Sequence, residues 1–548
     1  MDKRLLIFLL VFFAFFFGWQ KFIVEPYVKK NSPPKPPAVT TTKNAPAANS
    51  QSSAPVPAAT KPGTSTTLQP TASTQTHNVT VDTPLYRAQF SSKGAVLTSF
   101  RLKKYKDDFG QPLELVPDEF ASKALPLTID FEDPELTRLA LNSNFSVSDE
   151  YLTLNGNSTK ELQFLFSDGR YSFRKYFKFK ADSYLIDSIV EAHDGTNFIP
   201  VRLSWGPGIE SPKGYKKPQY LKPSRAIANI GEKIIRKDPP KEKEFVKIGA
   251  LSQWAGVENN YFMGLFIPAK PADTFLTNLE AKSKLVHNVV VIVAGPRAEP
   301  FALRIFIGPK DYELLKRLGM GLENVLDFGF FGPVAKILFD ALRFFNKYTN
   351  NWGWAILLLT IVVKIIFTPF VQKSFSSQRK LQAMQPEMKK VQDKYAKMKN
   401  DDPRKQNMNT EIMALHKRYG VNPLGGCLPM LIQMPVLFAF YRVLSNAIEL
   451  RHAPFALWIH DLSRPDPLWI SPILMGASML LQQRMTPISD PAQQKMLYIM
   501  PIMFTYISLN LQSGLVLYWL LSNILGIAHQ WYFQRQQKKL VPGVVQNA

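Results

Sequence analysis

The chain has 548 residues, a formal net charge of +23, and 46% hydrophobic and 12% aromatic residues. Its mean hydropathy of -0.10 is too polar for a protein buried entirely in lipid, so a large water-exposed part must accompany any apolar segments. The single cysteine, Cys427, excludes an intramolecular disulfide and a zinc site built from several cysteines. The positive charge leaves nucleic acid, anionic lipid and cytoplasmic membrane loops open as explanations.

The N-terminus predicts a signal anchor that is not cleaved. An apolar run follows two basic residues and extends from Leu5 to Val24, more weakly after Trp19. Its length approaches the ~20 residues that a membrane span needs, and no small-residue cleavage site follows it directly. We therefore expect residues 1–28 to hold the first span, with the N-terminus in the cytoplasm.

Residues 29–77 have a different composition, dominated by Pro, Ala, Thr and Ser, and the stretch from Lys29 to Thr76 has no acidic residue. Such a segment buries too little apolar surface to offset the loss of chain entropy on ordering. The sequence therefore predicts a disordered tether.

Residues 78–326 predict a β-sandwich outside the cytoplasm, which in a bacterium is the periplasm. Short alternating or β-branched and aromatic runs recur between turn signals, for example at 171–179, 183–189, 289–293 and 301–307. The segment contains no metal-binding cluster, nucleophile motif or phosphate-binding loop, so we expect a scaffold or docking domain.

Residues 327–350 predict an amphipathic helix in the membrane interface. Apolar residues recur at steps of three and four, and the charged residues occupy another face. The apolar set is Phe331, Val334, Leu338, Ala341, Phe345 and Tyr348. A helix packed against the β-sandwich is the alternative interpretation.

Residues 351–534 predict five further spans. Their expected ranges are 352–371, 427–447, 468–482, 497–511 and 514–533. The loop from Gln372 to Leu424 has twelve basic and five acidic residues, a net charge of +7, whereas the next loop, 448–467, has a net charge of -1. The tail, 535–548, is basic. Six spans with both termini in the cytoplasm satisfy the positive-inside rule, which also accounts for most of the basic charge.

The basic loop, residues 373–420, predicts a cytoplasmic hairpin of two helices. Apolar residues step by three and four on both sides of a short polar connection, in which Asp402 suits a helix N-cap and Pro403 the first helical position. The pattern favours antiparallel packing as a short coiled coil. Its basic outer face is either a solvated surface or a contact for ribosomal RNA, anionic lipid or a translocation partner.

Lys364 is the strongest functional signal because it lies well inside the expected 352–371 span. A charge at that depth costs at least a few kcal/mol unless it faces a polar cavity or a partner. We expect a hydrated groove that includes Lys364, Thr360 one turn away and Gln433 in the next span. The alternative is a lysine that extends to the cytoplasmic interface, about 10 Å of helix rise away.

Several long segments resemble the YidC/Oxa/Alb insertase family, in the Gram-negative form with a large outer domain. The matching segments are VNPLGGCLPMLIQMP at 421–435, APFALWIHDLS at 453–463, DPAQQK at 490–495, MP at 500–501 and SGLVLYWLLSN at 513–523. The resemblance is close over 351–533 and looser over the β-sandwich, where residues 261–268 and 307–310 carry it.

The resemblance implies a non-enzymatic membrane protein insertase and chaperone in the bacterial inner membrane, working alone or with the Sec translocon. Five core spans would enclose a hydrophilic groove that has one positive charge, here Lys364 where many members have arginine. Trp519 would be an aromatic residue that contacts substrates. The implied partners are nascent membrane proteins, the Sec translocon with its accessory subunits, the ribosome and anionic lipids, with no specific DNA binding. No cofactor and no metal are implied.

Three other classes of protein fit the sequence less well than an insertase. A solute transporter is disfavoured because the spans show no inverted repeat. An intramembrane enzyme is disfavoured because the spans contain no H-E-x-x-H motif, paired aspartates or Ser-His pair. A purely structural assembly protein is disfavoured because it would not need the charge of Lys364.

Overall fold

The computed structural model describes residues 75–117, 125–209, 224–231, 233–238, 240, 245–278, 289–396, 405–420, 428–485 and 491–540. The predicted first span, the tether and the terminal tail beyond Leu540 lie outside these residues, as do Cys427, Asp402 and Pro403. The described residues form two compact units, a β unit and a helical unit, which meet in the sequence between Leu326 and Asp327.

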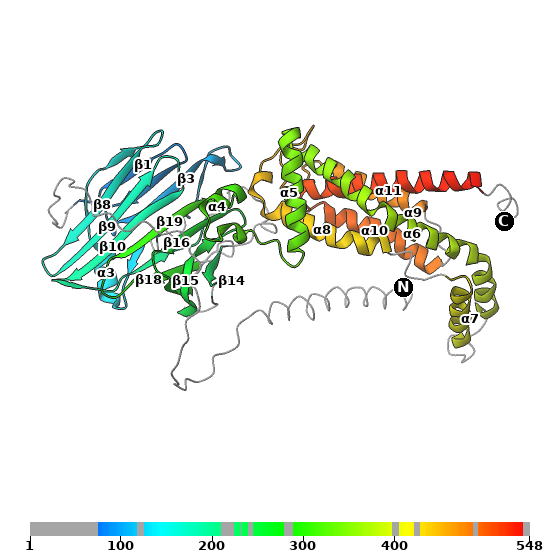
Figure 1. Ribbon diagram of the computed structural model, residues 1–548, viewed down its shortest axis with the longest axis horizontal. Helices are drawn as coiled ribbons and strands as arrows, with labels where there is room; N and C mark the ends of the chain where they lie inside the picture. The colour runs from blue at the N-terminus through cyan, green and yellow to red at the C-terminus, as the bar shows by residue number, and fades with distance from the viewer. Residues whose placement is uncertain are drawn as a thin grey trace, which may run out of the picture. The chain divides into compact units, whose positions relative to one another are not determined.

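The β unit consists of two sheets and confirms the predicted β-sandwich (Figure 1). The smaller sheet has the order β4-β3-β2-β1-β7, in which β1 and β7 are parallel and the other pairs antiparallel. Its strands are β1 (Asn78–Asp82), β2 (Tyr86–Ser91), β3 (Val96–Lys106), β4 (Pro112–Glu114) and β7 (Tyr151–Thr153).

The larger sheet follows the order β5-β12-β18-β17-β15-β16-β19-β10-β9-β8-β6, with β11, β13 and β14 attached at its sides. Its strands are β5 (Thr128–Asp130), β6 (Ser146–Val147), β8 (Thr159–Ser167), β9 (Tyr171–Lys180), β10 (Leu185–Asp194), β11 (Asn197–Phe198), β12 (Arg202–Trp205), β13 (Arg225–Ile230), β14 (Lys233–Lys237), β15 (Val246–Glu258), β16 (Phe262–Pro268), β17 (Ala272–Asn278), β18 (Val289–Ala294) and β19 (Phe301–Pro309). The unit also contains α3 (Pro134–Asn142), α4 (Tyr312–Leu318) and the 3-10 helix η3 (Leu322–Val325).

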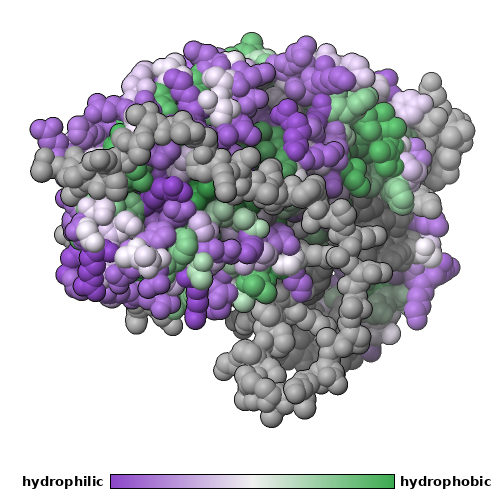
Figure 2. Space-filling model, turned by 60° about the vertical axis from the view of Figure 1, so that its left-hand side comes forward, coloured by the Kyte–Doolittle hydropathy of each residue, from purple (hydrophilic) through white to green (hydrophobic). Residues whose placement is uncertain are grey.

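Aromatic side chains fill the space between the two sheets. Because side chains alternate along a strand, Phe173, Phe177 and Phe179 of β9 all point inward and are buried. Phe90 of β2 meets this layer, with its ring centroid 5.4 Å from that of Phe177 and 6.0 Å from that of Phe164. Such pairs add about 0.5–1.5 kcal/mol each beyond the burial of their area. Figure 2, in which the β unit is turned toward the viewer, shows mainly hydrophilic side chains on the outer face.

Lys175 lies in the same inward row of β9 and is fully buried. Its Nζ donates to the backbone carbonyls of Gly94 (3.0 Å), Ala95 (2.8 Å) and Leu127 (2.8 Å). The three N–H groups of the ammonium therefore each have an acceptor. The first two acceptors belong to the turn between β2 and β3, so this lysine ties the larger sheet to the smaller one.

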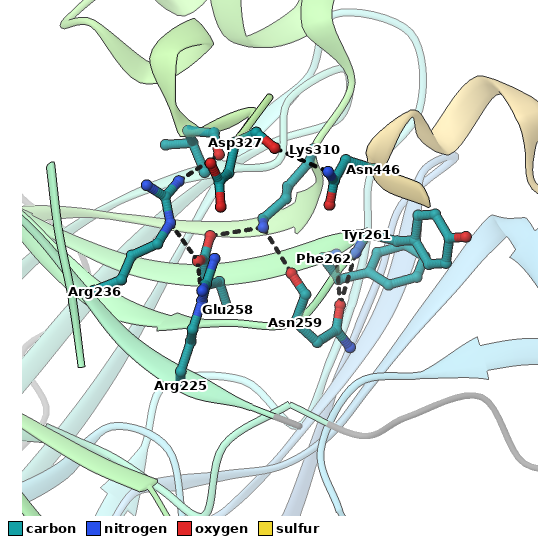
Figure 3. A network of polar contacts seen from close by, with 10 residues as sticks. Arg225, Arg236, Glu258, Asn259, Tyr261, Phe262, Lys310, Asp327 and Asn446 are labelled. Atoms are coloured by element: carbon teal, nitrogen blue, oxygen red, sulfur yellow. Dashed lines mark hydrogen bonds and ion pairs between the residues drawn. The ribbon is translucent and has the colours of Figure 1, made fainter. Parts of the chain in front are cut away.

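A second buried charge fastens the C-terminal segment of the β unit (Figure 3). The carboxylate of Glu258 lies 2.7 Å from Arg225 Nε, 2.8 Å from Arg236 Nε and 2.6 Å from Lys310 Nζ. Burial alone would raise the pKa of Glu258, but the three cations lower it to about 2. Arg236 also donates to the carbonyl of Val325 (2.6 Å), so the network holds the end of η3 against the sheet.

The helical unit begins with α5 (Gly332–Thr349), which crosses one end of a bundle whose other end bears α7 (Figure 1). The other helices are α6 (Trp352–Ala396), α7 (Lys405–Arg418), α8 (Leu428–Asn446), the 3-10 helix η5 (Ile448–Leu450), α9 (Ile470–Arg484), α10 (Pro491–Ser508) and α11 (Ser513–Leu540). The structure thus has a helix in each expected span from residue 352 onward.

The packed face of α5 differs from the predicted apolar stripe. Ala335, Leu338, Phe339 and Leu342 are buried, whereas Phe344 and Tyr348 are exposed. Only Leu338 belongs to both the predicted and the buried set. The helix is apolar on more than one side, so one apolar side packs against α6 and α8 while another stays free.

We predict that Lys175→Met will lower the free energy of unfolding of the β unit by about 3 kcal/mol, since three buried carbonyls lose their donor. Hydrogen exchange of β9 in the full chain, followed by mass spectrometry, measures this change. Lys178→Met is the matched control because its side chain is 38% exposed on the same strand. Equal protection of β9 in the two variants would show that Lys175 does not join the sheets.

We also predict a specific dependence of stability on pH. Burial lowers the pKa of Lys175 from 10.5 to about 7. Because the unfolded chain then binds this proton more tightly than the folded one, stability should rise with pH between about 7 and 10.5. Thermal unfolding of the full chain across this range should show the rise, and Lys175→Met should lose it. A rise of the same size in the variant would assign it to other groups.

Candidate functional site in the helical unit

One helix among the described residues is long and apolar enough to cross a membrane. This segment is Trp352–Gln372, the first 21 residues of α6, and the apolar part of α10, Tyr498–Ser508, is shorter. Asn351 caps the helix, because its Oδ1 accepts from the backbone N–H of Gly353 (2.8 Å). The helix then continues without a break to Ala396, so the span and the first arm of the hairpin are one element.

Lys364 and Thr360 lie one turn apart on α6, on the same side of the helix. Thr360 is buried and its hydroxyl donates to the carbonyl of Ile356 (2.7 Å). Lys364 is half-buried, and no ion pair joins it to a carboxylate among the residues that the structure describes. His529 of α11 lies within electrostatic range of Lys364.

Gln433 of α8 faces α11 rather than α6. Its Nε2 donates to the hydroxyl of Tyr518, whose ring stacks on that of Phe440 with centroids 4.5 Å apart. Tyr518 is buried, so this amide–hydroxyl pair is a polar contact inside an apolar helix interface. The residue of α11 that makes these contacts with α8 is therefore Tyr518, the neighbour of the predicted Trp519.

Trp519 is directed toward α10. Its ring meets that of Phe504 edge to face, with centroids 5.1 Å apart. Within the described contacts, neither Trp519 nor Gln433 touches Lys364 directly. The structure therefore places Lys364 with Thr360 and near His529, Gln433 with Tyr518, and Trp519 with Phe504, all within one helical unit.

A polar seam joins α9 and α11. Asn523 Nδ2 donates to Ser478 Oγ (3.1 Å), and two turns later Gln530 Nε2 donates to the carbonyl of Met485 (3.0 Å). On the other side of α9, a Cβ at Gly476 would lie 1.9 Å from Thr505 Oγ1, so only glycine permits this approach of α10. Membrane helices gain no hydrophobic driving force from association, because lipid tails are as apolar as their side chains. They associate through close packing at small residues and through single hydrogen bonds of this kind.

The two arms of the hairpin are held together by side chains from the second half of α6 and from α7. Glu411 accepts from Lys394 Nζ (2.8 Å) and from the hydroxyl of Tyr395 (2.8 Å). Tyr419 donates to Glu387 (2.6 Å). These contacts lie at the surface and fix the register of the arms, while the described lysines Lys380, Lys389, Lys390 and Lys417 are exposed.

Sequence reasoning missed Tyr518, His529 and the Ser478–Asn523 pair. A usable signal was present, because Tyr518, Ser522 and His529 recur at helical spacing within the apolar 514–533 segment. Polar residues on one side of an apolar helix indicate which side faces other helices or water. That pattern identifies the polar side of the helix but not the neighbouring helix that this side contacts.

The comparisons with known proteins fit this architecture. Residues 78–341 match the family model described as YidC periplasmic domain, and residues 344–540 match that of the 60Kd inner membrane protein. A protein of Syntrophus aciditrophicus is 37% identical over 98% of this chain and 100% of its own length. One of Lawsonia intracellularis is 40% identical over 84% and 87%. Both are named membrane protein insertase YidC.

A solved structure of an active YidC insertase covers 83% of this chain and 92% of its own, at 18% identity and a TM-score of 0.37. The two matched family models define the class: an inner-membrane protein with a periplasmic β-sandwich domain. The chain belongs to the YidC family of membrane protein insertases.

We predict that Gln433 and Tyr518 stabilise the helical unit as a pair. Tyr518→Phe removes the acceptor and should cost about 1 kcal/mol, the size found for hydrogen bonds between membrane helices. Gln433→Leu and the double variant complete a cycle, measured as thermal unfolding of the full chain in lipid nanodiscs. The double variant should cost less than the sum of the two single changes. Additive effects would show that the contact contributes nothing.

Proposed function

We propose that this protein inserts membrane proteins into the bilayer and assists their folding, through a hydrated groove in which Lys364 supplies one positive charge. The activity named for the relatives supports insertion as the function. The observation that carries the groove is the position of Lys364, twelve residues after Trp352 and eight before Gln372. At 1.5 Å per residue it lies about 18 Å from one end of the span and about 12 Å from the other.

An ammonium group at that depth needs polar surroundings. Its cost in hydrocarbon is at least a few kcal/mol, and no described carboxylate forms an ion pair with it. Thr360 beside it, His529 on α11 and the Gln433–Tyr518 pair supply polar groups within the same bundle. Water among these groups would keep the lysine charged, and the groove would shorten the apolar path that a polar segment must cross.

The proposed mechanism is physical and uses no covalent chemistry. Lys364 attracts the polar or acidic segment that a client must carry across the membrane, and this attraction is stronger in a low-dielectric surrounding than in water. The client's apolar segment then leaves the groove sideways into lipid, driven by burial of its apolar surface. Exposed apolar residues of α6 and α10, such as Ile365 and Ile502, line the boundary with lipid along which it would move.

We further propose six spans, five of which form the core, with both termini in the cytoplasm and the β unit in the periplasm. The net charge of +7 on the 372–424 loop supports a cytoplasmic hairpin. The helices α8, α9, α10 and α11 would be the third to sixth spans. The described lengths of α8 and α11, 19 and 28 residues, are compatible with crossing.

The basic hairpin is the proposed contact for the ribosome, anionic lipids and the Sec translocon. Its two arms are already fixed to each other by the Glu411 and Glu387 contacts. The exposed lysines and arginines therefore form a preorganised positive surface, which attracts RNA phosphates and lipid headgroups over about 8 Å at physiological salt.

The test is photocrosslinking from position 519 with ribosome-bound nascent chains that expose one apolar segment. We expect crosslinks to that segment. Lys364→Glu should reduce insertion of clients with an acidic outer segment by roughly tenfold, the effect of about 1.4 kcal/mol of lost attraction. Lys364→Arg, which keeps the charge, is the matched control and should insert them normally. Normal insertion by Lys364→Glu, together with no crosslinks at 519, would contradict the groove mechanism.

A further inference from the structure

The loop between α8 and α9, residues 447–469, displays large apolar side chains that the bundle does not cover. Leu457 is 80% exposed, and Leu468 and Trp469 are each 57% exposed. Isolated exposed apolar residues are common on proteins, but these three belong to one short segment that is otherwise well packed. Its Leu450, Ile459 and Leu462 are buried. The exposed set therefore belongs to a folded loop.

Asp461 organises the first half of this loop. Its Oδ1 accepts from the backbone N–H of His452 (3.2 Å) and of Ser463 (2.9 Å), and from the hydroxyl of Ser463 (2.7 Å). Its Oδ2 lies 3.1 Å from Arg464 Nε. One carboxylate thus closes the segment from 452 to 464 into a compact turn.

Asp466 organises the second half in the same way. Its carboxylate accepts from Trp458 Nε1 (3.1 Å), the N–H of Leu468 (2.9 Å), and both the N–H (2.8 Å) and the hydroxyl (2.6 Å) of Ser471. Burial raises the pKa of Asp466, but these hydrogen bonds outweigh it and leave the pKa below its ordinary value. The buried carboxylate therefore stays ionised and holds the start of α9.

The backbone of the loop is strained at residues that carry its exposed side chains. Leu457 has a φ of 56° and Trp469 a φ of 57°, as does His452 at 56°. These are left-handed conformations that bulky side chains rarely adopt, and they persist only where the surroundings over-determine them. Two of the three strained residues are the apolar ones directed outward. The fold thus tolerates backbone strain, which lowers its stability, at two residues whose side chains are exposed, Leu457 and Trp469.

The depth of the loop follows from its contacts with α6. The ring of Phe455 packs edge to face on Trp354 at 5.6 Å, and its carbonyl accepts from Asn351 Nδ2 (3.0 Å). The fit is close, since a Cβ at Gly353 would lie 2.0 Å from Phe455 Cδ2. Asn351, Gly353 and Trp354 form the beginning of the Trp352–Gln372 span, so Phe455 lies level with the end of the apolar segment.

The same loop also covers the start of α11. The N–H of Ser513 donates to the carbonyl of Arg464 (2.6 Å), and the N–H of Gly514 to that of Leu462 (3.0 Å). The loop therefore joins the ends of two helices and cannot move in depth independently of them. Residues at this level of a bilayer contact both headgroups and the outermost acyl carbons.

We propose that the α8–α9 loop is a rigid interfacial anchor, in which Leu457, Leu468 and Trp469 enter the lipid at the outer surface of the membrane. Lipid is the occupant because the contacts with α6 set the depth, and because a tryptophan beside aliphatic residues suits the boundary between headgroups and hydrocarbon. The proposal rests on the placement of α6 across the bilayer under the proposed function. The anchor would fix the depth of the helical bundle relative to the outer surface of the membrane.

The test measures depth with an environment-sensitive fluorophore on single cysteines. The full chain with Cys427→Ser is reconstituted in vesicles that contain lipids bearing a nitroxide near the headgroup or deep in the acyl chain. Leu457→Cys and Trp469→Cys should show blue-shifted emission and quenching by the shallow nitroxide. The exposed His460, in the same loop, provides the matched control: His460→Cys should emit as in water.

Ile365→Cys separates failure of this proposal from failure of the proposed function. This exposed residue of α6 should be quenched by the deep nitroxide. If it is, while Leu457→Cys and Trp469→Cys behave as His460→Cys, only the anchor is overturned. Absence of quenching at Ile365 would overturn the membrane placement of α6 and the anchor with it. Protection of Leu457 that needs an added client or a second copy of the chain would overturn lipid as the occupant.

The role of Asp466 in holding the loop is tested on the same labelled positions. Asp466→Asn removes the charge and replaces one acceptor oxygen by a donor, so the contacts of Ser471 and Trp458 with Oδ2 and the contact of Leu468 with Oδ1 cannot all persist. A nitroxide spin label attached to the cysteine of Leu457→Cys should become more mobile and lose its fixed depth when Asp466→Asn is added. Unchanged mobility and depth would overturn the claim that this carboxylate makes the anchor rigid.

Discussion

An ammonium group in the middle of a 21-residue apolar helix restricts what can surround that helix. If Lys364 faced hydrocarbon, its charge would oppose insertion of the helix. If it met a carboxylate, its field would be cancelled. Among the described residues no carboxylate forms an ion pair with Lys364, and the same bundle contains uncharged polar groups and His529. The polar contacts of α8 and α11 are consistent with this requirement, since they keep polar groups inside the bundle rather than on its lipid side.

The two units solve opposite problems with buried charge. In the β unit, water surrounds the domain, so Lys175 and Glu258 can be buried because every donor or acceptor of their charged groups meets a partner. There, buried charge joins elements: one sheet to the other, and the C-terminal segment to the sheet. In the helical unit, Lys364 forms no ion pair with any carboxylate that the structure describes. A charge left without a fixed partner is suited to a transient one.

The sequence was informative wherever a period or a composition repeats over many residues. Alternation in β9 and β10 predicted the β-sandwich, and the apolar run after Trp352 predicted the long helix. Contacts between distant positions were less accessible. The side of α5 that packs could not be chosen because the helix is apolar on more than one side. Tyr518 was missed because its contact with Gln433 joins residues that are far apart in the sequence. Alternation places Lys175 in the same row as Phe173 and Phe177. The sequence does not show its acceptors, because the carbonyls of Gly94, Ala95 and Leu127 come from distant segments.

The continuity of α6 has a mechanical consequence. Its 45 residues have a contour length of about 68 Å, more than twice the thickness of the hydrocarbon layer. The contacts of Phe455 fix one end of the helix, and the other end forms the first arm of the hairpin. A force on the hairpin would therefore act at the far end of a long lever that is held at its membrane end. Pro369 and Pro386 each interrupt the helical hydrogen bonding and give the arm two points of lower bending stiffness. Under the proposed topology, a force applied to the hairpin in the cytoplasm would reach the level of Lys364 as a tilt, with Pro369 determining how much of it is transmitted.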